Sequence, residues 1–597
     1  MAQRVKTKLE LESGKKIVHF KDLVVYQDLF RHHRFEMTVP FSELEKKDEI
    51  FFQHSHKDVC GKTLSVSFES EAKKTSFDFR FKGVVTEIIL SNQSDFSSVF
   101  ILKGYSPTLL LEDCSQRRTF IGKNMQQIFE TVLKDYPGNV IKKKLDPRNK
   151  NTIPYAVQYD ETNFAFISRL AAEYGEWFYY DGQEIILGSS QGEKDVDFLI
   201  DGNQSFDMSI SLMPAKFNMT GYDYTMDQSY KGKSSGQPVD GLGQFSRFAL
   251  DESENLFSQE ALLISGKPVY NQNELDDLIK FRRSGIASNL VVFHGRGENP
   301  DLTVGSVISV SATRPEKGGR GSQESVGKYR ITEITHTVDN NGNYANVFKA
   351  VPETAKFPPV NAFIMHPAGQ PELATVTDNN DPDKLSRVKV AFNWAGDNKE
   401  SPWIRVGSFY TGGDDRKGMQ FIPEKESQVV VGYEMDKPEM PFIMTSLYPK
   451  KDGMRSRKGN NDEKAFYTKA GNLIELSDKQ GENRIQITNV NNEDTALMIE
   501  FKDNGAITLK TNGKINIEAQ ENISISAKQK LSLEAQEIEI KAQNKVSVNG
   551  TSISIEADTT AEMKANASAK LSSANTEVSG DAMTTIKGGL VLSLIHI

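Results

Sequence analysis

The C-terminal part of the chain carries a short repeat that constrains its fold more than any other feature. Pairs of branched or apolar residues at spacing i, i+2 begin at 499, 507, 515, 523, 531, 538, 546, 553, 561, 569, 576 and 584. Both members of such a doublet lie on one face of a strand. No aromatic residue follows Phe501 and no proline follows Pro449, which is typical of an unbroken hydrogen-bonded ladder around a narrow interior. The sequence therefore predicts short stacked strands over 499–591.

Two ways of closing these strands into a core are open. One strand of this kind exposes only two apolar side chains and cannot bury a core alone, so stacking must supply one. A single chain could wind a triangular solenoid of about three strands per coil, or three identical chains could wind together and each contribute a strand to every layer. In the trimeric closure the core is predicted to consist of Ile507, Leu509, Ile515, Ile517, Ile523, Ile525, Leu531, Leu533, Ile538, Ile540, Val546, Val548, Ile553 and Ile555.

Length, charge and cysteine content exclude several classes of protein. At about 150 residues per domain, 597 residues correspond to roughly four domains. The formal charge of −9 gives no general attraction to nucleic acid or anionic membranes. The N-terminus lacks the apolar segment of a signal peptide, and no apolar run approaches the ~18 residues that a membrane-spanning helix needs. Cys60 and Cys114 cannot staple so long a chain, so we expect folding in a reducing compartment.

Residues 1–360 are predicted to form a mixed base of strands and helices. Runs at 64–68 and 77–88 alternate with the period of a strand. A helix is predicted over 124–136, where an apolar stripe ends at Pro137 and Gly138. A second helix is predicted over 162–174, followed by Gly175 in a left-handed turn.

Prolines at 352, 358, 359, 367 and 371 indicate a linker near residue 360. Five strand-like runs follow within 361–450, at 373–377, 386–394, 403–407, 427–433 and 441–447, which favours a small barrel. Residues 451–498 are assigned to a connector and to the entry of the repeat. The basic residues around the start of this connector are Lys450, Lys451, Arg455, Arg457 and Lys458.

Several segments resemble, in order, those of VgrG spike proteins of type VI secretion systems. The segment 158–180, QYDETNFAFISRLAAEYGEWFYY, is similar to the family's characteristic helix-to-strand segment, and 334–352, ITHTVDNNGNYANVFKAVP, is similar to its closing strand pair. The stretches 381–394, 403–406, 421–423 and 430–441 match its barrel domain in order and spacing. The resemblance covers nearly the whole chain, and its specificity comes from the colinearity of these segments with the repeat that follows.

The resemblance implies a mainly β fold with an α+β base. The expected parts are a phage hub-like base of two barrel subdomains with inserted helices over 1–360, an OB-fold barrel over 361–450, and a trimeric triple-stranded β-helix needle, or β-prism, over 499–591. The implied function is that of a non-enzymatic, homotrimeric spike of a contractile injection apparatus, which pierces the target envelope mechanically. A tail spike or baseplate hub of a prophage or extracellular injection particle has the same architecture and remains the alternative.

The same resemblance implies the partners and the route of the protein. An Hcp-like tube protein and baseplate proteins would contact the base, a PAAR-type tip protein would sit at the needle end, and effectors or adaptors would be carried. The spike would assemble in the cytoplasm and leave by a Sec-independent route. No cofactor, metal or nucleic acid is expected.

An enzymatic domain is not expected between barrel and needle. Phage spikes of this plan can carry a lysozyme there, and a glycoside hydrolase needs two carboxylates on a scaffold of domain size. The interval 449–474 is too short for one, so Asp462 and Glu463 are interpreted as solvated connector residues. The chain also lacks a nucleophile elbow, a phosphate loop and a dinucleotide fingerprint.

Metal sites are weakly indicated. His54, His56 and Cys60 are residue types that bind zinc, but we expect an exposed loop with a small buried thiol. His294 and His336 lie in strand contexts and are expected to be hydrogen-bonded structural groups. The run 378–383 imitates a calcium loop, yet it lacks glycine at the sixth position and glutamate at the twelfth, so it is predicted to be a turn.

The barrel also contains the basic and aromatic residue types through which OB folds bind single-stranded nucleic acid. Two of them, Trp394 and Trp403, are expected to serve the barrel core instead, so nucleic-acid binding is disfavoured. The candidates are Arg387, Lys389, Phe392, Trp394, Trp403 and Arg405.

The last six residues, 592–597, abandon the doublet spacing with the sequence LSLIHI. The same hexapeptide is encoded by one frame of a common transposase-based sequencing adapter. We therefore expect 592–597 to be adapter sequence, with the genuine end of the needle and any extension absent. The alternative is a natural hydrophobic tail beneath a tip protein.

Overall fold

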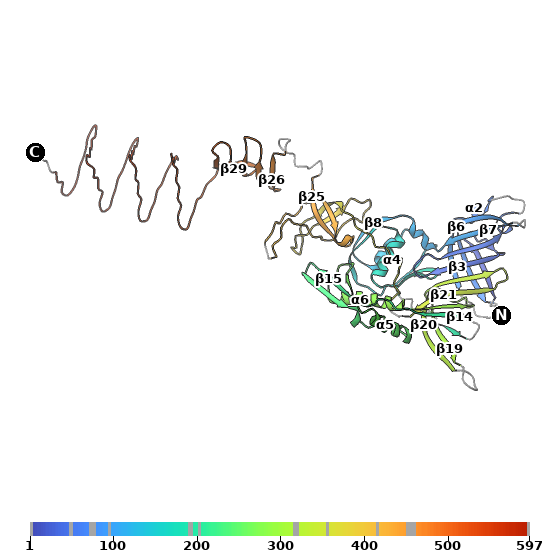
Figure 1. Ribbon diagram of the computed structural model, residues 1–597. Coiled ribbons are helices and arrows are strands. Elements are labelled where there is room, and N and C mark those ends of the chain that lie inside the picture. Colours follow the sequence, from blue (N-terminus) through green and yellow to red (C-terminus); the bar gives the residue numbers. More distant parts are fainter. Residues whose placement is uncertain are drawn as a thin grey trace. The chain divides into compact units, whose positions relative to one another are not determined.

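The computed structural model describes residues 4–46, 52–70, 79–93, 97–188, 195–200, 205–314, 322–353, 357–413, 417–448 and 461–593. The chain divides into two compact units, Met1–Arg455 and Ser456–Ile597 (Figure 1). The basic connector residues predicted at 450–458 lie outside the described residues, as does most of the terminal hexapeptide. No helix in the described part of the chain is long and apolar enough to cross a membrane.

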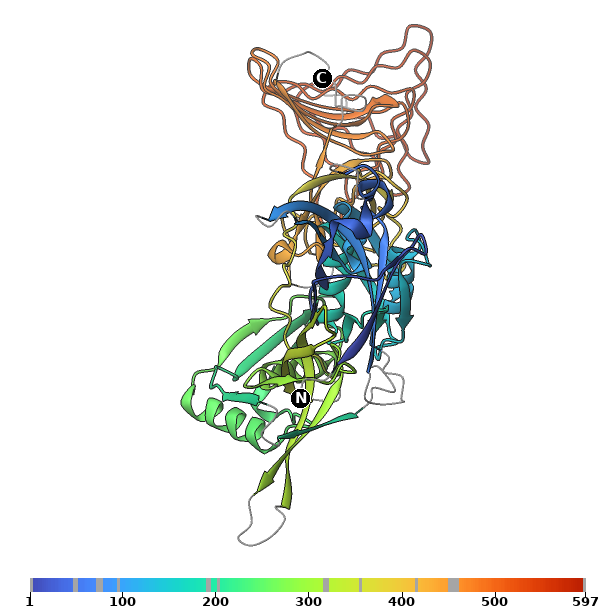
Figure 2. The same cartoon turned by 90° about the vertical axis from the view of Figure 1, so that its right-hand side faces the viewer.

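The first unit is built around a large mixed sheet of thirteen described strands, which pair in the order β14-β18-β21-β20-β3-β4-β7-β6-β5-β1-β2, with β19 beside β20 and β13 beside β19. The strands are β1 Val5–Leu11, β2 Lys16–Ile17, β3 Asp22–Asp28, β4 Arg34–Pro40, β5 Thr63–Ser70, β6 Phe79–Gln93, β7 Ser97–Tyr105, β13 Asp195–Ile200, β14 Ser205–Ile210, β18 Val291–Gly297, β19 Val307–Arg314, β20 Ser322–Asp339 and β21 Tyr344–Pro352. The strands predicted at 64–68 and 77–88 are confirmed in β5 and β6. Both views show β19 and the adjoining end of β20 extending beyond the body of the sheet (Figures 1 and 2).

Alternation along the central strands explains where the core lies. In β3 and β4, every second residue is buried, including Val25, Phe35 and Met37. Two short helices, α1 Phe41–Leu44 and α2 Ser55–Asp58, follow β4. Since one face of this part of the sheet is apolar, it needs a covering layer, which the next segment of the chain supplies.

The covering layer contains both helices predicted from the sequence. Helix α3, Met125–Leu133, begins at Asn124 with a capping box and ends three residues earlier than predicted, while α4, Asn163–Glu173, begins where Thr162 caps the Ala165 amide. Gly175 follows α4 with φ +64°, as predicted. The other elements of this layer are η1 Pro107–Glu112, β8 Gln116–Asn124, β9 Lys142–Leu145, β10 Thr152–Glu161, β11 Phe178–Tyr180 and β12 Glu184–Leu187.

A second insertion contains two helices that the sequence analysis did not place. They are α5 Gln244–Leu256 and α6 Gln272–Ser288. Helix α6 buries Leu275, Leu278 and Ile279 at helical spacing, and its Asn271 N-cap accepts a hydrogen bond from the Glu274 amide. The accompanying elements are β15 Phe217–Asp223, β16 Gln228–Lys233, η2 Ser234–Gly236 and β17 Ala261–Ile264.

The described part of the barrel has four strands and one irregular run that closes it. The strands β22 Glu372–Asp378, β23 Lys389–Phe392, β24 Gln428–Tyr433 and β25 Pro441–Leu447 pair in the order β23-β22-β24-β25, with η3 Glu434–Asp436 between the last two. The predicted fifth strand at 403–407 instead makes isolated bridges, from Ile404 to Val388 and from Val406 to Ile443. Because this run pairs briefly with strands at both edges, it closes the sheet into a barrel without forming a regular ladder.

The second unit begins with a five-stranded antiparallel meander, where the sequence analysis expects a connector and the first doublets. Its strands, each paired with its neighbours in sequence, are β26 Glu463–Tyr467, β27 Asn472–Ser477, β28 Arg484–Asn489, β29 Asn492–Glu500 and β30 Ala506–Lys510. From 511 to 593 the chain has neither helix nor strand and forms an open winding (Figure 1). Strands over 499–591 are therefore present only as far as β30 in the single chain.

Candidate functional site

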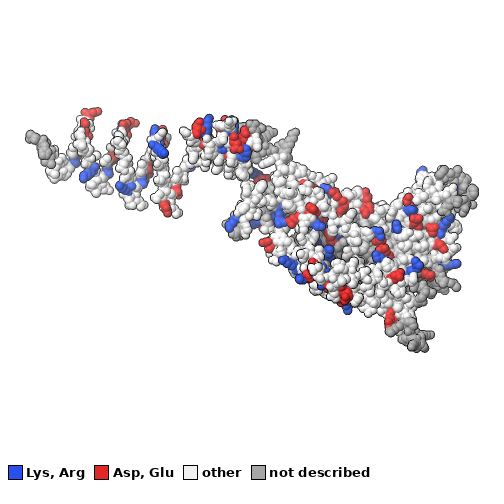
Figure 3. Space-filling model, viewed as in Figure 1, with Lys and Arg blue, Asp and Glu red and all other residues white. Residues whose placement is uncertain are grey.

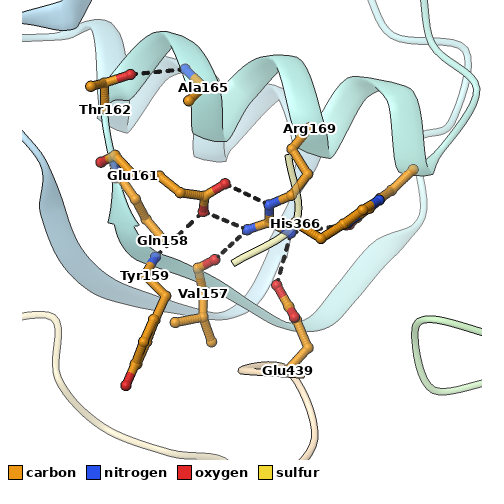
Figure 4. A network of polar contacts seen from close by, with 10 residues as sticks. Val157, Gln158, Tyr159, Glu161, Thr162, Ala165, Arg169, His366 and Glu439 are labelled. Carbon is orange, nitrogen blue, oxygen red and sulfur yellow. Dashed lines mark hydrogen bonds and ion pairs between the residues drawn. The ribbon is translucent and has the colours of Figure 1, made fainter. Parts of the chain in front are cut away.

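A buried arginine on α4 joins the base to the barrel (Figure 4). Arg169 is 1% exposed, and its Nε and Nη2 donate to the two oxygens of Glu161 at 2.7 and 2.8 Å. Its Nη1 donates to Glu173 Oε1 and to Glu439 Oε1, both at 2.9 Å, and Nη2 also donates to the Val157 carbonyl at 2.8 Å. Since Glu439 precedes β25 whereas the other partners belong to β10 and α4, one cation links two domains.

His366, from the proline-rich linker, completes this junction cluster of Arg169, Glu161, Glu173, Glu439 and His366. Its Nδ1 lies 3.4 Å from Glu173 Oε1. Burial acts to raise the pKa of Glu173, but attraction to Arg169 and the hydrogen bond with His366 outweigh it and lower the pKa to about 2. Burial raises the pKa of Glu439, with a contribution from the nearby Glu173 charge, despite the attraction of Arg169. The pKa values of two neighbouring carboxylates are thus shifted in opposite directions.

A second polar contact ties the same domains together around Glu372, at the start of β22. Trp394 Nε1 donates to Glu372 Oε2 at 2.6 Å, and the Tyr433 hydroxyl is hydrogen-bonded to Glu372 Oε1. Arg117 of β8, in the base, donates to Glu372 Oε2 at 3.4 Å. Barrel and base therefore share this carboxylate as well.

Apolar packing follows the same path across the junction. Val157 and Tyr159 of β10 belong to the hydrophobic core of the barrel. The Tyr159 ring lies edge-on to Tyr433 at 5.9 Å and to Trp394 at 6.1 Å between ring centroids. The segment 158–180, which carries the resemblance described above, thus begins inside this junction. The ion pairs and the packed rings of this junction can hold the base and the barrel rigidly together.

The acidic turn at 378–383 is used for structure. Arg387 Nε and Nη2 donate to the two oxygens of Asp381 at 2.9 and 2.8 Å, and Nη2 also donates to Asp383 at 2.6 Å. These hydrogen bonds lower the pKa of Asp381. The prediction of a turn is confirmed, and the first nucleic-acid candidate, Arg387, is occupied by it.

The other barrel candidates are also engaged within the protein. Lys389 Nζ lies 5.0 Å from the ring centroid of Trp403, and Arg405 is paired with Glu434 while lying over the Tyr224 ring. The rings of Phe392 and Trp394 stack on each other, with their centroids 4.5 Å apart. Phe392 is buried, and Trp394 donates its indole hydrogen bond to Glu372. Acidic and basic side chains are intermixed over the visible face of the first unit (Figure 3). The six side chains therefore do not form a free stacking platform.

The histidine and cysteine candidates do not converge on a metal site. Among the described residues, no three His, Cys, Asp or Glu side chains are grouped to hold a metal. His56 lies in the one-turn helix α2, with His54 just before it. The expectation that Cys60 is a small buried thiol is wrong: its side chain is exposed, because Val59 fills the buried position after α2.

The two strand histidines differ from each other. His336 is fully buried, and its Nδ1 lies 2.7 Å from the Tyr344 hydroxyl, so the prediction of a hydrogen-bonded structural group is confirmed for it. Burial lowers the pKa of His336 to about 3. His294 lies on the exposed side of β18.

The doublets of the repeat are open to solvent in the single chain. The fourteen predicted core residues range from 49% exposed at Ile515 to 79% at Ile555. Monomeric proteins rarely expose so long a series of aliphatic side chains. This segment is thus a series of aliphatic side chains that the single chain leaves uncovered.

The backbone of the repeat is equally open. Within the described residues 511–593, no hydrogen bond joins one backbone group to another. The chain bends once in each repeat, at 512–513, 520–521, 528–529, 536, 543–544, 551, 558–559, 566–567, 574–575, 581–582 and 589–590. The single-chain solenoid left open above is therefore contradicted, since a solenoid would pair successive coils within the chain.

A further regularity of the repeat escaped the sequence analysis. The fourth residue after the first doublet member is small in nearly every repeat and lies just before or at the bend, as at Ala519, Ala527, Ala535, Ala542 and Gly550. The signal that could have revealed it is a second column of alanine and glycine alongside the doublets. Small side chains there leave room for another segment to pack close to the backbone at each bend.

Comparison with known proteins gives this arrangement a family. Residues 35–342, just over half of the chain, match the phage tail baseplate hub (GPD) family model. Residues 372–448 match the type VI secretion system/phage-baseplate injector OB domain. The expected fold class of an α+β base followed by an OB barrel is thereby confirmed, whereas the β-helix needle stays a prediction.

Curated relatives are similar over most of this chain. The type VI secretion system spike protein VgrG5 of Pseudomonas aeruginosa is 24% identical over 452 residues, which cover 64% of this chain and 53% of that protein. The spike protein VgrG1a of the same organism is 22% identical over 497 residues, covering 73% and 71%. This chain thus spans about half the length of the first of these relatives. The resemblance to VgrG spike proteins is confirmed.

A solved structure agrees at the level of fold. The half-lidded Francisella PdpA–VgrG complex contains a chain that matches 85% of this one over 88% of its own length, with a TM-score of 0.53 and 10% identity. A base built on a large mixed sheet, fixed to an injector OB barrel through β10 and Arg169, is thus found here together with the hub family's sequence pattern. The chain belongs to the phage tail baseplate hub (GPD) family.

Proposed function

We propose that this chain is the structural subunit of a homotrimeric spike in a contractile injection apparatus. The repeat carries the proposal, because residues 511–593 expose their apolar doublets and leave their backbone unpaired in one chain. Unpaired backbone groups and exposed aliphatic side chains are both satisfied when three copies wind together and each supplies a strand to every layer.

The energetic gain of such assembly is large. Fully burying an isoleucine, leucine or valine side chain contributes about 1.5–3 kcal/mol. The predicted core residues are at least half-exposed in almost every case, so each chain gains a substantial part of that amount at fourteen positions. A close-packed branched-aliphatic core with continuous ladders would be stiff, which suits a needle driven by contraction of a sheath.

The base and barrel then act as the mount of the needle. The shared side chains Arg169 and Glu372 resist displacement of the barrel from the base when force is applied along the spike. The expected partners are an Hcp-like tube protein and baseplate proteins at the base, a PAAR-type tip protein at the needle end, and carried effectors or adaptors. The spike would assemble in the cytoplasm, leave by a Sec-independent route, and pierce the target membrane without binding nucleic acid.

The action of the spike is mechanical rather than enzymatic. The matched family consists of hub proteins, and the buried charges described above are engaged in structural ion pairs. A type VI spike is favoured over a prophage or extracellular particle by the similarity to VgrG5 and VgrG1a. Neighbouring genes distinguish the two: a membrane-spanning complex supports the first, and capsid genes support the second.

Electron microscopy of the purified full-length chain tests the proposal. At about 4.8 Å per strand layer, the ten doublets of 511–593 in each of three chains form a three-sided rod of about 48 Å. We expect particles with a broad base and a rod of this length. Particles without a rod would contradict the proposal.

A further inference from the structure

The meander β26–β30 carries a face made of aliphatic side chains. Directly opposed residues on successive strands share one face, and the pairings place Ile474, Ile487, Leu497 and Leu509 in one column. The neighbouring column is Leu476, Ile485, Ile499 and Ile507. These two columns define the apolar face. It is open in the single chain, with Ile474 43% and Ile487 47% exposed.

The opposite face of the meander is mostly polar, and Leu473 and Ala496 on it are buried within the single chain. Glu475, in the middle of β27, is 3% exposed and accepts a hydrogen bond from Arg484 Nη2 at 3.0 Å. Antiparallel sheets normally cover their apolar face and expose their polar one. Here the charged side chain is covered while the aliphatic columns are open, so the apolar face lacks its partner.

The repeat identifies this partner as the same face of further copies of the chain. Leu509 ends the first column of the apolar face and Ile507 ends the second, on the last strand of the meander, β30. Together they form the doublet that begins at 507 in the repeat. The doublets at 515 and 523 continue the same i, i+2 spacing without interruption. Whatever buries the repeat must therefore also approach the apolar face of the meander.

The repeat alone leaves the alignment of three chains ambiguous. Since doublets recur every seven or eight residues, chains displaced by one repeat would bury nearly the same set of side chains. The meander has no such ambiguity, because its doublets at 474, 485, 497 and 507 are unevenly spaced and its strands are already paired.

We infer that the meander is the nucleus and the register-setting element of the trimer. Its strands pair only with sequence neighbours, so it can form within one chain before association. Residues 511–593 have no backbone ladder of their own and order only when partner strands arrive. Three apolar faces meet first, fix the alignment, and the repeat then assembles outward from β30. This inference rests on the proposed trimeric spike.

Three paired substitutions in the full-length chain separate nucleation from stability. Ile487→Lys with Leu497→Lys changes one opposed pair on the apolar face, and Gln486→Lys with Met498→Lys changes the adjacent opposed pair on the other face. Ile538→Lys with Ile540→Lys changes a doublet in the middle of the repeat. Each variant is diluted from urea, and trimer formation is followed by light scattering after size-exclusion chromatography. Tryptophan fluorescence reports the first unit independently, because all three tryptophans lie there.

The register is measured by cross-linking lysines of the repeat between chains, followed by mass spectrometry. We expect the apolar-face variant to form trimers at least about tenfold more slowly, or not at all, with a native tryptophan signal. Trimers that do form should contain added cross-links displaced by seven or eight residues. The opposite-face variant should match the wild type. The mid-repeat variant should associate at nearly the wild-type rate, and its trimer should dissociate at a lower urea concentration than the wild-type trimer.

Two results overturn the inference while leaving the spike intact. One is an apolar-face variant that forms trimers at the wild-type rate in a single register. The other is a mid-repeat variant that slows association as much as the apolar-face variant does. A wild-type chain that forms no trimer would instead overturn the proposed function, and the inference with it.

Discussion

Replacing Arg169 by methionine should destabilise the first unit more than any surface substitution. Arg169 holds Glu161, Glu173 and Glu439 together at 2.7–2.9 Å in a buried place. Methionine fills a similar volume but leaves three carboxylates without their common cation. Removing one partner of a buried ion pair costs about 3–5 kcal/mol. We expect a loss of this size in the free energy of unfolding at pH 7.

Urea unfolding followed by tryptophan fluorescence measures this loss, because Trp177 reports the base while Trp394 and Trp403 report the barrel. The matched control is Lys150→Met, which breaks a pair with Asp146 whose two side chains are each 60% exposed. Exposed pairs contribute little to stability. The difference between the two variants should shrink as the pH falls toward 4, since protonated carboxylates no longer repel. If Arg169→Met costs no more than Lys150→Met, the junction cluster does not hold the two domains together.

Three further perturbations follow from the described contacts. Glu173→Gln should destabilise the protein at pH 7, because the lowered pKa of Glu173 contributes stability that is present above its unfolded pKa of 4.5 and lost as the pH falls toward 2. Glu439→Gln should leave the stability at pH 7 unchanged or raised, because the pKa of Glu439 is raised. Urea titrations across pH 3–7 measure both effects, and equal effects of the two variants would refute the assigned directions. Gly175→Ala should cost about 1–2 kcal/mol because φ is +64° and the new Cβ would lie 2.9 Å from Phe281, while Gly138→Ala, with nothing within 4 Å, should cost little in the same assay. Ile515→Asp with Ile517→Asp should prevent trimerisation of the needle in sedimentation experiments, because it places charges in the predicted core. A substitution at an outward-facing residue, such as Glu518→Gln, should have little effect. Equal loss of trimer in the two variants would refute the assignment of Ile515 and Ile517 to the core.

The parts of the fold that the sequence predicted are those specified by local signals. Helices α3 and α4 combine an apolar stripe with a cap, at Asn124 and Thr162. The ends of both predicted ranges lie within three residues of the observed helix ends. The barrel strands alternate cleanly, so four of five were found. Helices α5 and α6 were missed, although Asn271 and Glu274 of α6 form a recognisable N-terminal signal.

The remaining features depend on distant or irregular relations. Glu439 lies 270 positions from Arg169, so no local pattern could indicate the junction cluster. The meander is not predicted by the repeat, because its doublets are spaced by ten to twelve residues instead of seven or eight and so have no constant period. The run at 403–407 bridges two strands briefly, and its alternation alone did not distinguish this from a regular strand.

Sedimentation equilibrium of the full-length chain tests the central claim most directly. The account predicts a single species with three times the 66.8 kDa mass of one chain, stable on dilution because the doublets of the repeat are buried only between chains. A folded species that remains at 66.8 kDa over the whole concentration range would contradict it.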